Sequence, residues 1–169
     1  MSQQYENGSY VVYGKMGVCR VVEQKRMDFG GEMGDYYVLC PVSDSRSSVY
    51  VPCGNPQLMG RMHPLLTREA IEVMLAGVDE RQIYWIDDRN QRLQAFKEIQ
   101  AAGDRQELMR LIRCLYKKKQ EKAAAGKRLS SMDEMILGEC IRLVEEEFAL
   151  ALDIPRSEVA TFIRQRLDE

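Results

Sequence analysis

The chain has 169 residues, of which 45% are hydrophobic and 30% charged, and its formal net charge is −2. This composition excludes an intrinsically disordered chain, and no apolar run approaches the roughly 20 residues that a membrane helix needs. The polar start MSQQYENGSY lacks the apolar stretch of a secretory signal, so we expect a cytoplasmic protein.

Residues 1–60 have the pattern of a small β domain. Runs rich in β-branched and aromatic residues follow one another in SYVVYGKMGVCRVVEQKRM, in YYVLCPV at 36–42 and in SVYVP at 48–52. Turns are expected at KMG, in a glycine-rich hairpin loop over 28–35 and at SDSRS. Short strands joined by tight turns predict a strongly bent sheet or a small SH3-like β-barrel.

Residues 61–169 change to the period of helices, and about five are expected there. They are 68–76 capped by Thr67, a helix from about 86 to 102, one capped by Asp104, one capped by Ser130 and a short terminal helix opened by Ser157. The buried side of the helix after Ser130 is expected to hold Met135, Ile136, Ile141, Leu143, Val144 and Phe148. The fold class is therefore α+β, with a β domain over 1–60 and an all-helical domain over 61–169.

Charge is divided unevenly along the helical half. Residues 105–128 carry 9 basic and 2 acidic groups, a local charge of +7, whereas residues 129–169 carry 4 and 10, a local charge of −6. The basic segment is a candidate phosphate-facing surface. Within it, Lys117–Lys119 cover most of the circumference of a helix, so at most two can face DNA together. A solvated face without a partner is the other interpretation.

We find no pattern typical of an enzyme or of a metal or cofactor site. Phosphate-binding, dinucleotide-binding and nucleophile-elbow motifs are all missing, and the one histidine, His63, has no carboxylate or Cys beside it in sequence. Glu145–Glu147 point in different directions on a helix and are expected to form a solvated face. Five scattered cysteines without a C-x-x-C pair predict reduced, mostly buried thiols.

Several segments, taken in order, resemble the CarD/CdnL family of bacterial regulators that bind RNA polymerase. VVYGKMGVCRVVE at 11–23 is similar to the opening strand, turn and strand of that family. YYVL and SVYVP match later strands of the same module, which is shared with transcription-repair coupling factors. Trp85 followed by Arg89 and Arg92, then AAGD, LYKKKQEK and LSSMDEMILGECIRLVEEEFA, extend the resemblance over nearly all of the chain.

The chain departs from the usual family pattern at three places. Gly14-Lys15-Met16 stands where the family has Pro-x-His after V-V-Y. An arginine that often follows the second strand has Arg26 as its nearest counterpart, and Tyr50 occupies a position where some members have another arginine. These departures concern the side chains of the polymerase contact more than its backbone.

The resemblance implies that the N-terminal domain is a Tudor-like barrel that docks on the β subunit of RNA polymerase, largely by pairing of sheet edges. An exposed edge offers unpaired N–H and C=O groups that a partner strand can satisfy. The candidate residues are Arg26, Val49, Tyr50, Val51 and Pro52. In the alternative interpretation, Tyr50 and Val51 fill the interior of the barrel.

The resemblance also implies that the helical domain lies on promoter DNA near the upstream edge of the transcription bubble. Trp85 would act as a wedge in the minor groove, where an aromatic ring offsets the cost of unstacking, although packing in the core is the alternative. Basic side chains would hold phosphates with weak sequence specificity. The candidates are Arg89, Arg92, Lys117, Lys118, Lys127 and Arg128.

The sequence therefore predicts a bacterial transcription regulator without enzymatic activity. It would act as a monomer, associated with the nucleoid through RNA polymerase, and would modulate the stability of open complexes. A protein-interaction adaptor without a DNA role is the alternative. A sequence-specific DNA binder is disfavoured because no base-reading recognition helix stands out.

Overall fold

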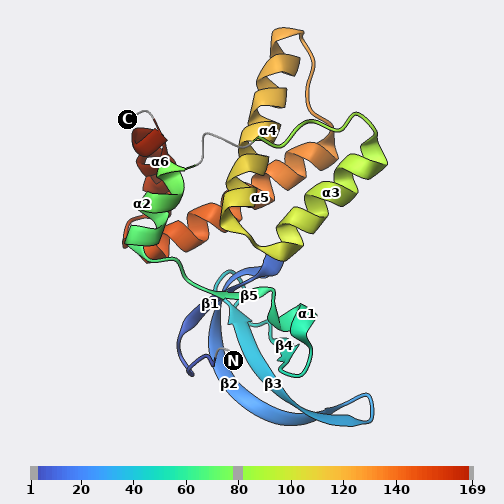
Figure 1. Ribbon diagram of the computed structural model, residues 1–169, viewed down its shortest axis with the longest axis vertical. Coiled ribbons are helices and arrows are strands. Elements are labelled where there is room, and N and C mark those ends of the chain that lie inside the picture. The colour runs from blue at the N-terminus through green and yellow to red at the C-terminus, as the bar shows by residue number, and fades with distance from the viewer. Residues whose placement is uncertain (1–3, 78–81, 168–169) are drawn as a thin grey trace. The chain divides into compact units, whose positions relative to one another are not determined.

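The computed structural model describes residues 4–77 and 82–167 (Figure 1). The chain divides into two compact units, Met1–Leu65 and Leu66–Glu169. This division lies a few residues after the boundary expected from the sequence, because a short strand that the sequence pattern did not reveal, β5, pairs with β1 and belongs to the first unit.

The N-terminal unit is built on an antiparallel five-stranded sheet in the order β4-β3-β2-β1-β5. Its elements are β1 (Tyr10–Tyr13), the 3₁₀ turn η1 (Gly14–Met16), β2 (Gly17–Phe29), β3 (Glu32–Pro41), β4 (Val49–Pro52), α1 (Pro56–Met59) and β5 (Met62–Pro64). The outer strands β4 and β5 do not pair in the described part of the chain, so the sheet is open. The α+β layout is as predicted, but a closed barrel is not shown.

The hairpin between β2 and β3 is tighter than expected. The sequence predicted a loop over 28–35, whereas the two strands pair as far as Phe29 and Glu32. Only Gly30 and Gly31 lie between them, with φ of +64° and +91°. Two successive residues with positive φ are what a two-residue hairpin turn matching the twist of the strands requires. Glycine makes this turn possible, and the rest of the predicted loop is strand.

One face of the sheet holds the core of the N-terminal unit. The buried residues are Val11, Cys19, Val21, Tyr37, Leu39, Val51 and Met62. Tyr5 adds a polar contact, because its hydroxyl donates to the carbonyl oxygen of Met62 on β5 at 3.0 Å. Its backbone N–H donates to the Tyr37 hydroxyl at 3.2 Å. Tyr5 thereby binds the segment before β1 to both β3 and β5.

The second unit is helical in its described part. Its elements are α2 (Arg68–Ala76), α3 (Arg89–Ala102), α4 (Arg105–Ala124), α5 (Ser131–Leu152), the 3₁₀ turn η3 (Arg156–Glu158) and α6 (Val159–Leu167). None of the helices that the structure describes has the length and apolar character needed to cross a lipid bilayer.

Side-chain caps fix where these helices begin. Thr67, Asp104 and Ser130 each accept a hydrogen bond from the backbone N–H three residues on, as predicted. The helix expected from residue 86 begins later, at Arg89, because Asp88 caps it by accepting from the N–H of Gln91. Trp85 therefore lies in the non-helical segment before α3.

The core of the helical unit is larger than that of the sheet and surrounds α5. Its most fully buried side chains include Ile71, Phe96, Leu111, Leu115 and Phe148, from α2, α3, α4 and α5. The predicted buried side of α5 is correct for Ile136, Leu143, Val144 and Phe148, and Ile141 is half-buried. It is wrong for Met135, which is 50% exposed.

The glutamate run on α5 is not the solvated face that was expected. Glu147 is buried and accepts two hydrogen bonds of 2.9 Å from the Arg105 guanidinium and one of 3.0 Å from the N–H of Leu66. Glu146 is also buried and pairs with Arg142. Glu147 thus ties the start of the helical unit and the first turn of α4 to α5.

Candidate functional site

The first candidate site is the free edge of β4, because the direction of its backbone groups follows from the register. Tyr37 faces Val51 and Val38 faces Tyr50 across β3 and β4, and the N–H of Cys53 donates to the carbonyl of Asp35 at 2.8 Å. Hydrogen-bonded pairs alternate along an antiparallel ladder. Val51 therefore bonds to β3, while the N–H and C=O of Tyr50 point away from it.

Proline limits this edge on one side. Pro52 has no N–H to donate, and its carbonyl accepts from the N–H of Asn55 at 3.2 Å. The backbone groups that remain for a partner strand centre on Tyr50. We call this short stretch, Val49–Pro52 with its outward backbone at Tyr50, the β4 edge.

Side chains on β4 alternate between the core and the outer face. Val51 is fully buried, whereas Tyr50 is 41% exposed. On the outer face the Tyr50 ring lies 5.9 Å from the Phe29 ring, which in turn lies 5.5 Å from the Tyr36 ring. The two interpretations of this strand therefore each apply to one residue: Val51 fills the interior and Tyr50 is available outside.

Arg26 lies apart from the β4 edge. It is on β2, so β3 separates it from the free edge. Its guanidinium lies 3.8 Å from the Asp35 carboxylate, and both side chains are more than half exposed. An ion pair of this kind contributes little to stability, so Arg26 remains available as a surface contact.

The second candidate site surrounds the only tryptophan and forms what we call the Trp85 cluster: Trp85, Arg92, Phe96 and Lys118. The indole is half-buried. The Arg92 guanidinium lies 4.3 Å and the Lys118 ammonium 5.3 Å from its ring centre. The Phe96 ring meets it edge-on at 6.2 Å. Cation–π and edge-to-face contacts thus position a ring that also packs against the helical core.

Arg92 is occupied inside the protein. It is only 7% exposed and its guanidinium donates to both carboxylate oxygens of Asp133 on α5, at 3.2 and 3.0 Å. It also donates to the backbone carbonyls of Ile86 and Asp87, at 3.0 and 3.2 Å. This side chain was predicted to hold phosphate, but its bonds instead fix the segment that carries Trp85 to α5.

Three other side chains that were predicted to contact DNA lie near the starts of α3 and α5. Arg89 is exposed at the first residue of α3, and Lys127 and Arg128 are exposed in the loop before α5. The Arg92–Asp133 ion pair brings the starts of α3 and α5 together, and Figure 1 shows the two helices converging there. The positive ends of two helices and three exposed cations thus lie around one end of the unit.

The lysines of the run Lys117–Lys119 on α4 have different surroundings. Lys118 covers the indole and pairs with Glu121 at 3.7 Å. Lys119 pairs with Glu134 at 3.2 Å. Lys117 is exposed and, among the described residues, has no ion-pair partner. The run is therefore neither a single DNA-facing surface nor a uniformly solvated face.

Tyr84 is a candidate contact that the sequence interpretation missed. It is 79% exposed, the largest exposed fraction among the large apolar side chains of the described residues. It precedes the half-buried Trp85 in the non-helical segment before α3, and the two neighbouring rings differ in their exposure. The sequence signal that could have identified Tyr84 was an aromatic pair shortly before the residue that caps α3.

Thiol chemistry at these cysteines is unfavourable. Burial raises the pKa of the Cys53, Cys114 and Cys140 thiols above their ordinary value. A nucleophilic cysteine requires the opposite shift. Within residues 4–77 and 82–167, no group of three or more His, Cys, Asp or Glu side chains is arranged to hold a metal ion.

The free energy of unfolding is expected to fall when the pH rises from about 8 to about 10. The fall is expected to be up to about 1.4 kcal/mol larger for the wild type than for the Cys140→Ala variant. Burial raises the pKa of the Cys140 thiol to about 12 from 9.0. The unfolded chain therefore ionises first, and the contribution to stability is complete below pH 9.0 and falls as pH rises. Urea unfolding followed by Trp85 fluorescence measures the difference, and equal losses would contradict it.

Comparison with known families identifies the N-terminal unit. Residues 5–64 match the family model described as the CarD-like/TRCF RID domain. The match confirms the resemblance found in the sequence for this part of the chain, which is thus an RNA polymerase-interacting domain. It spans β1 to β5 and ends before α2. Among curated proteins, no relative of the chain was found.

Proposed function

We propose that this protein is a transcription regulator without enzymatic activity that joins RNA polymerase to promoter DNA. The N-terminal unit binds the polymerase β subunit through the β4 edge. The helical unit contacts promoter DNA near the upstream edge of the bubble and modulates the stability of the open complex. The observation that carries the proposal is the free β4 edge within a CarD-like/TRCF RID domain.

Strand addition is the form of binding that the β4 edge supports best. Tyr50 presents an N–H and a C=O away from the sheet, and its exposed ring continues the aromatic group formed with Phe29 and Tyr36. Main-chain hydrogen bonds give such a contact its affinity, and alternate side chains give it specificity. The backbone edge does not depend on the arginine that some members of the CarD/CdnL family have at the position of Tyr50.

Tyr50→Pro is expected to weaken binding of the full chain to the polymerase β subunit about tenfold or more. Proline removes the outward N–H, and its ring occupies the space that the partner's carbonyl would take. The sheet is expected to remain folded because this N–H takes no part in the ladder with β3. Titration of labelled β subunit measures the affinity, and circular dichroism verifies the fold.

Two variants separate the backbone from the side chain. Tyr50→Ala keeps the outward N–H and C=O and is expected to bind more tightly than Tyr50→Pro. Val51→Pro removes an N–H that bonds to β3 and is expected to unfold the N-terminal unit. Equal binding by Tyr50→Pro and Tyr50→Ala would contradict strand addition.

Two features support the DNA contact: a ring positioned at the surface and cations that surround it. Trp85 is half-buried, so part of the indole is available to a disturbed base step. Arg89, Lys127 and Arg128 are exposed beside the positive ends of α3 and α5, where phosphates are favoured. Arg92 is not a phosphate contact in this proposal, and its role is to position the indole.

The tether to polymerase makes weak DNA binding sufficient. A few exposed cations give an affinity that falls steeply with salt and carries little sequence information. Once the N-terminal unit is bound to polymerase, the helical unit meets upstream DNA at a high effective concentration. Target choice would then belong to the polymerase and its promoters rather than to this chain.

A further inference from the structure

The helical unit contains a pocket that its proposed DNA role does not explain. α4, α5, α6 and the segment 82–85 line a cavity of about 820 Å³. Pockets for small-molecule ligands are typically about 300–1,000 Å³. Its apolar lining comes from Ile83, Trp85, Met109, Ile112, Val144 and Ile163. It is thus both large enough and apolar enough to enclose a hydrocarbon chain.

Positive charge dominates the polar part of this lining. Arg110, Arg113, Lys117, Lys118 and Arg164 contribute to it, against the carboxylates of Glu121 and Glu145. Both carboxylates are already paired, because Glu121 lies 3.7 Å from Lys118 and Glu145 lies 3.1 Å from Arg156 on η3. Arg110 is paired too, with Glu107. Among the described lining residues the cations still outnumber the carboxylates, so the net charge of this lining is positive.

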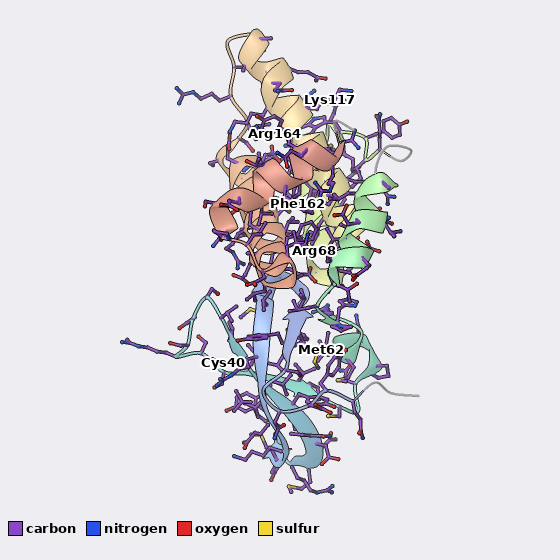
Figure 2. All side chains as sticks on the ribbon, turned by 90° about the vertical axis from the view of Figure 1, so that its left-hand side faces the viewer. Cys40, Met62, Arg68, Lys117, Phe162 and Arg164 are labelled. Atoms are coloured by element: carbon purple, nitrogen blue, oxygen red, sulfur yellow. The ribbon has the colours of Figure 1, made fainter. Side chains whose placement is uncertain are left out.

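Two of the cations are available to a ligand. Lys117 on α4 and Arg164 on α6 are exposed, and neither has an ion-pair partner among the described residues. Figure 2 shows both side chains at the same end of the helical unit, and both line the pocket. An anion between them would meet two like charges that are otherwise uncompensated, which is the arrangement that favours its binding most.

We propose that this pocket binds an amphipathic anion, a carboxylate carried on a long unbranched hydrocarbon chain. The chain lies among the apolar side chains of α4, α5 and α6, and the carboxylate lies at the rim between Lys117 and Arg164. A neutral alcohol of the same length lacks the ionic contact, and a cationic amphiphile meets repulsion. The site belongs to the helical unit alone and does not rest on the proposed binding of polymerase or DNA.

The only tryptophan lines the pocket and therefore reports its occupancy. Titrating the full chain with dodecanoate, below the concentration at which it forms micelles, is expected to produce a saturable change in Trp85 fluorescence. Decanoate is expected to bind about fifteenfold more weakly, since each buried methylene contributes about a factor of four. Dodecanol and dodecyltrimethylammonium are the neutral and cationic probes, and dodecanoate is expected to bind at least about tenfold more tightly than the ammonium.

Variants locate the binding in the pocket. Ala160→Phe places a ring in part of the cavity from an exposed position on α6 and is expected to weaken dodecanoate binding. Removing both rim charges, by Lys117→Ala with Arg164→Ala, is expected to weaken dodecanoate about tenfold and to leave dodecanol unchanged. Lys97→Ala is the matched control, because this exposed lysine on α3 lies outside the lining.

A second measurement does not depend on the indole. Dodecanoate is expected to raise the unfolding temperature of the wild type and of Lys97→Ala, because a ligand that binds only the folded state stabilises it by mass action. It is expected to raise the unfolding temperature of Ala160→Phe by less. Equal affinity for the anionic, neutral and cationic probes, or unaltered binding by Ala160→Phe, would overturn the proposal. These results would leave the test of the β4 edge unaffected.

Discussion

Asp133→Ala is expected to lower the free energy of unfolding of the helical unit by about 3–5 kcal/mol, the largest stability loss that we foresee for a single substitution in this unit. The Asp133 carboxylate is fully buried, accepts two hydrogen bonds from the Arg92 guanidinium in the first turn of α3, and accepts a third from the Ser130 hydroxyl. Removing it leaves a buried cation without its partner and removes the contact that holds the Trp85 segment to α5. Denaturant unfolding followed by Trp85 fluorescence measures the loss.

Two further variants show whether the ion pair is the cause. Arg89→Ala removes an exposed arginine from the same helix turn and is expected to change stability by less than about 0.5 kcal/mol. Replacing both partners, by Arg92→Met with Asp133→Leu, is expected to recover much of the loss, because no unpaired charge remains. A stable Asp133→Ala protein whose Trp85 emission matches the wild type would refute the positioning role of Arg92.

Trp85→Ala is expected to reduce the effect of the protein on open-complex lifetime by a factor of about 5 to 150. This range corresponds to the roughly 1–3 kcal/mol that a base–aromatic contact contributes. Binding to the polymerase β subunit is expected to remain as in the wild type, since the indole lies in the helical unit and the β4 edge in the other. Competitor-challenged promoter complexes measure the lifetime.

Two control variants accompany this prediction. One keeps an aromatic ring at position 85, and the other leaves the indole in place. Trp85→Phe retains an aromatic wedge and is expected to keep part of the effect. Val73→Ala removes an apolar side chain that is 74% exposed on α2, outside the Trp85 cluster, and is expected to keep all of it. If folded Trp85→Ala protein altered the lifetime as the wild type does, the DNA contact would be wrong, and an adaptor that binds polymerase alone would be the better interpretation.

The parts of the fold that the sequence predicted are those determined by neighbouring residues. Thr67, Asp104 and Ser130 cap helices through an N–H three residues on, so the information is local. The strands alternate as expected, and the family resemblance of residues 5–64 was recognisable from their order. β5 was missed because three residues ending in proline have no strand pattern, and pairing with β1 alone makes them a strand.

The candidate site was harder to predict because its geometry depends on distant partners. Arg92 and Asp133 are 41 residues apart, and nothing near Arg92 in the sequence indicates that its charge is buried. Glu147 likewise meets Arg105 on α4, 42 residues away. In both cases the sequence showed a charged residue on a helix, and only packing decided whether the charge faced water or a partner.

The two edges of the sheet have different consequences for assembly. On β5, the outward carbonyl of Met62 already accepts the Tyr5 hydroxyl, and Pro64 has no N–H to offer. A strand added at the β4 edge therefore has no counterpart at the opposite side, and pairing cannot continue from one molecule to the next. Under the proposed strand addition, the sheet would accept one strand and no more, which would favour a one-to-one complex and protect an aromatic edge from fibrillar growth.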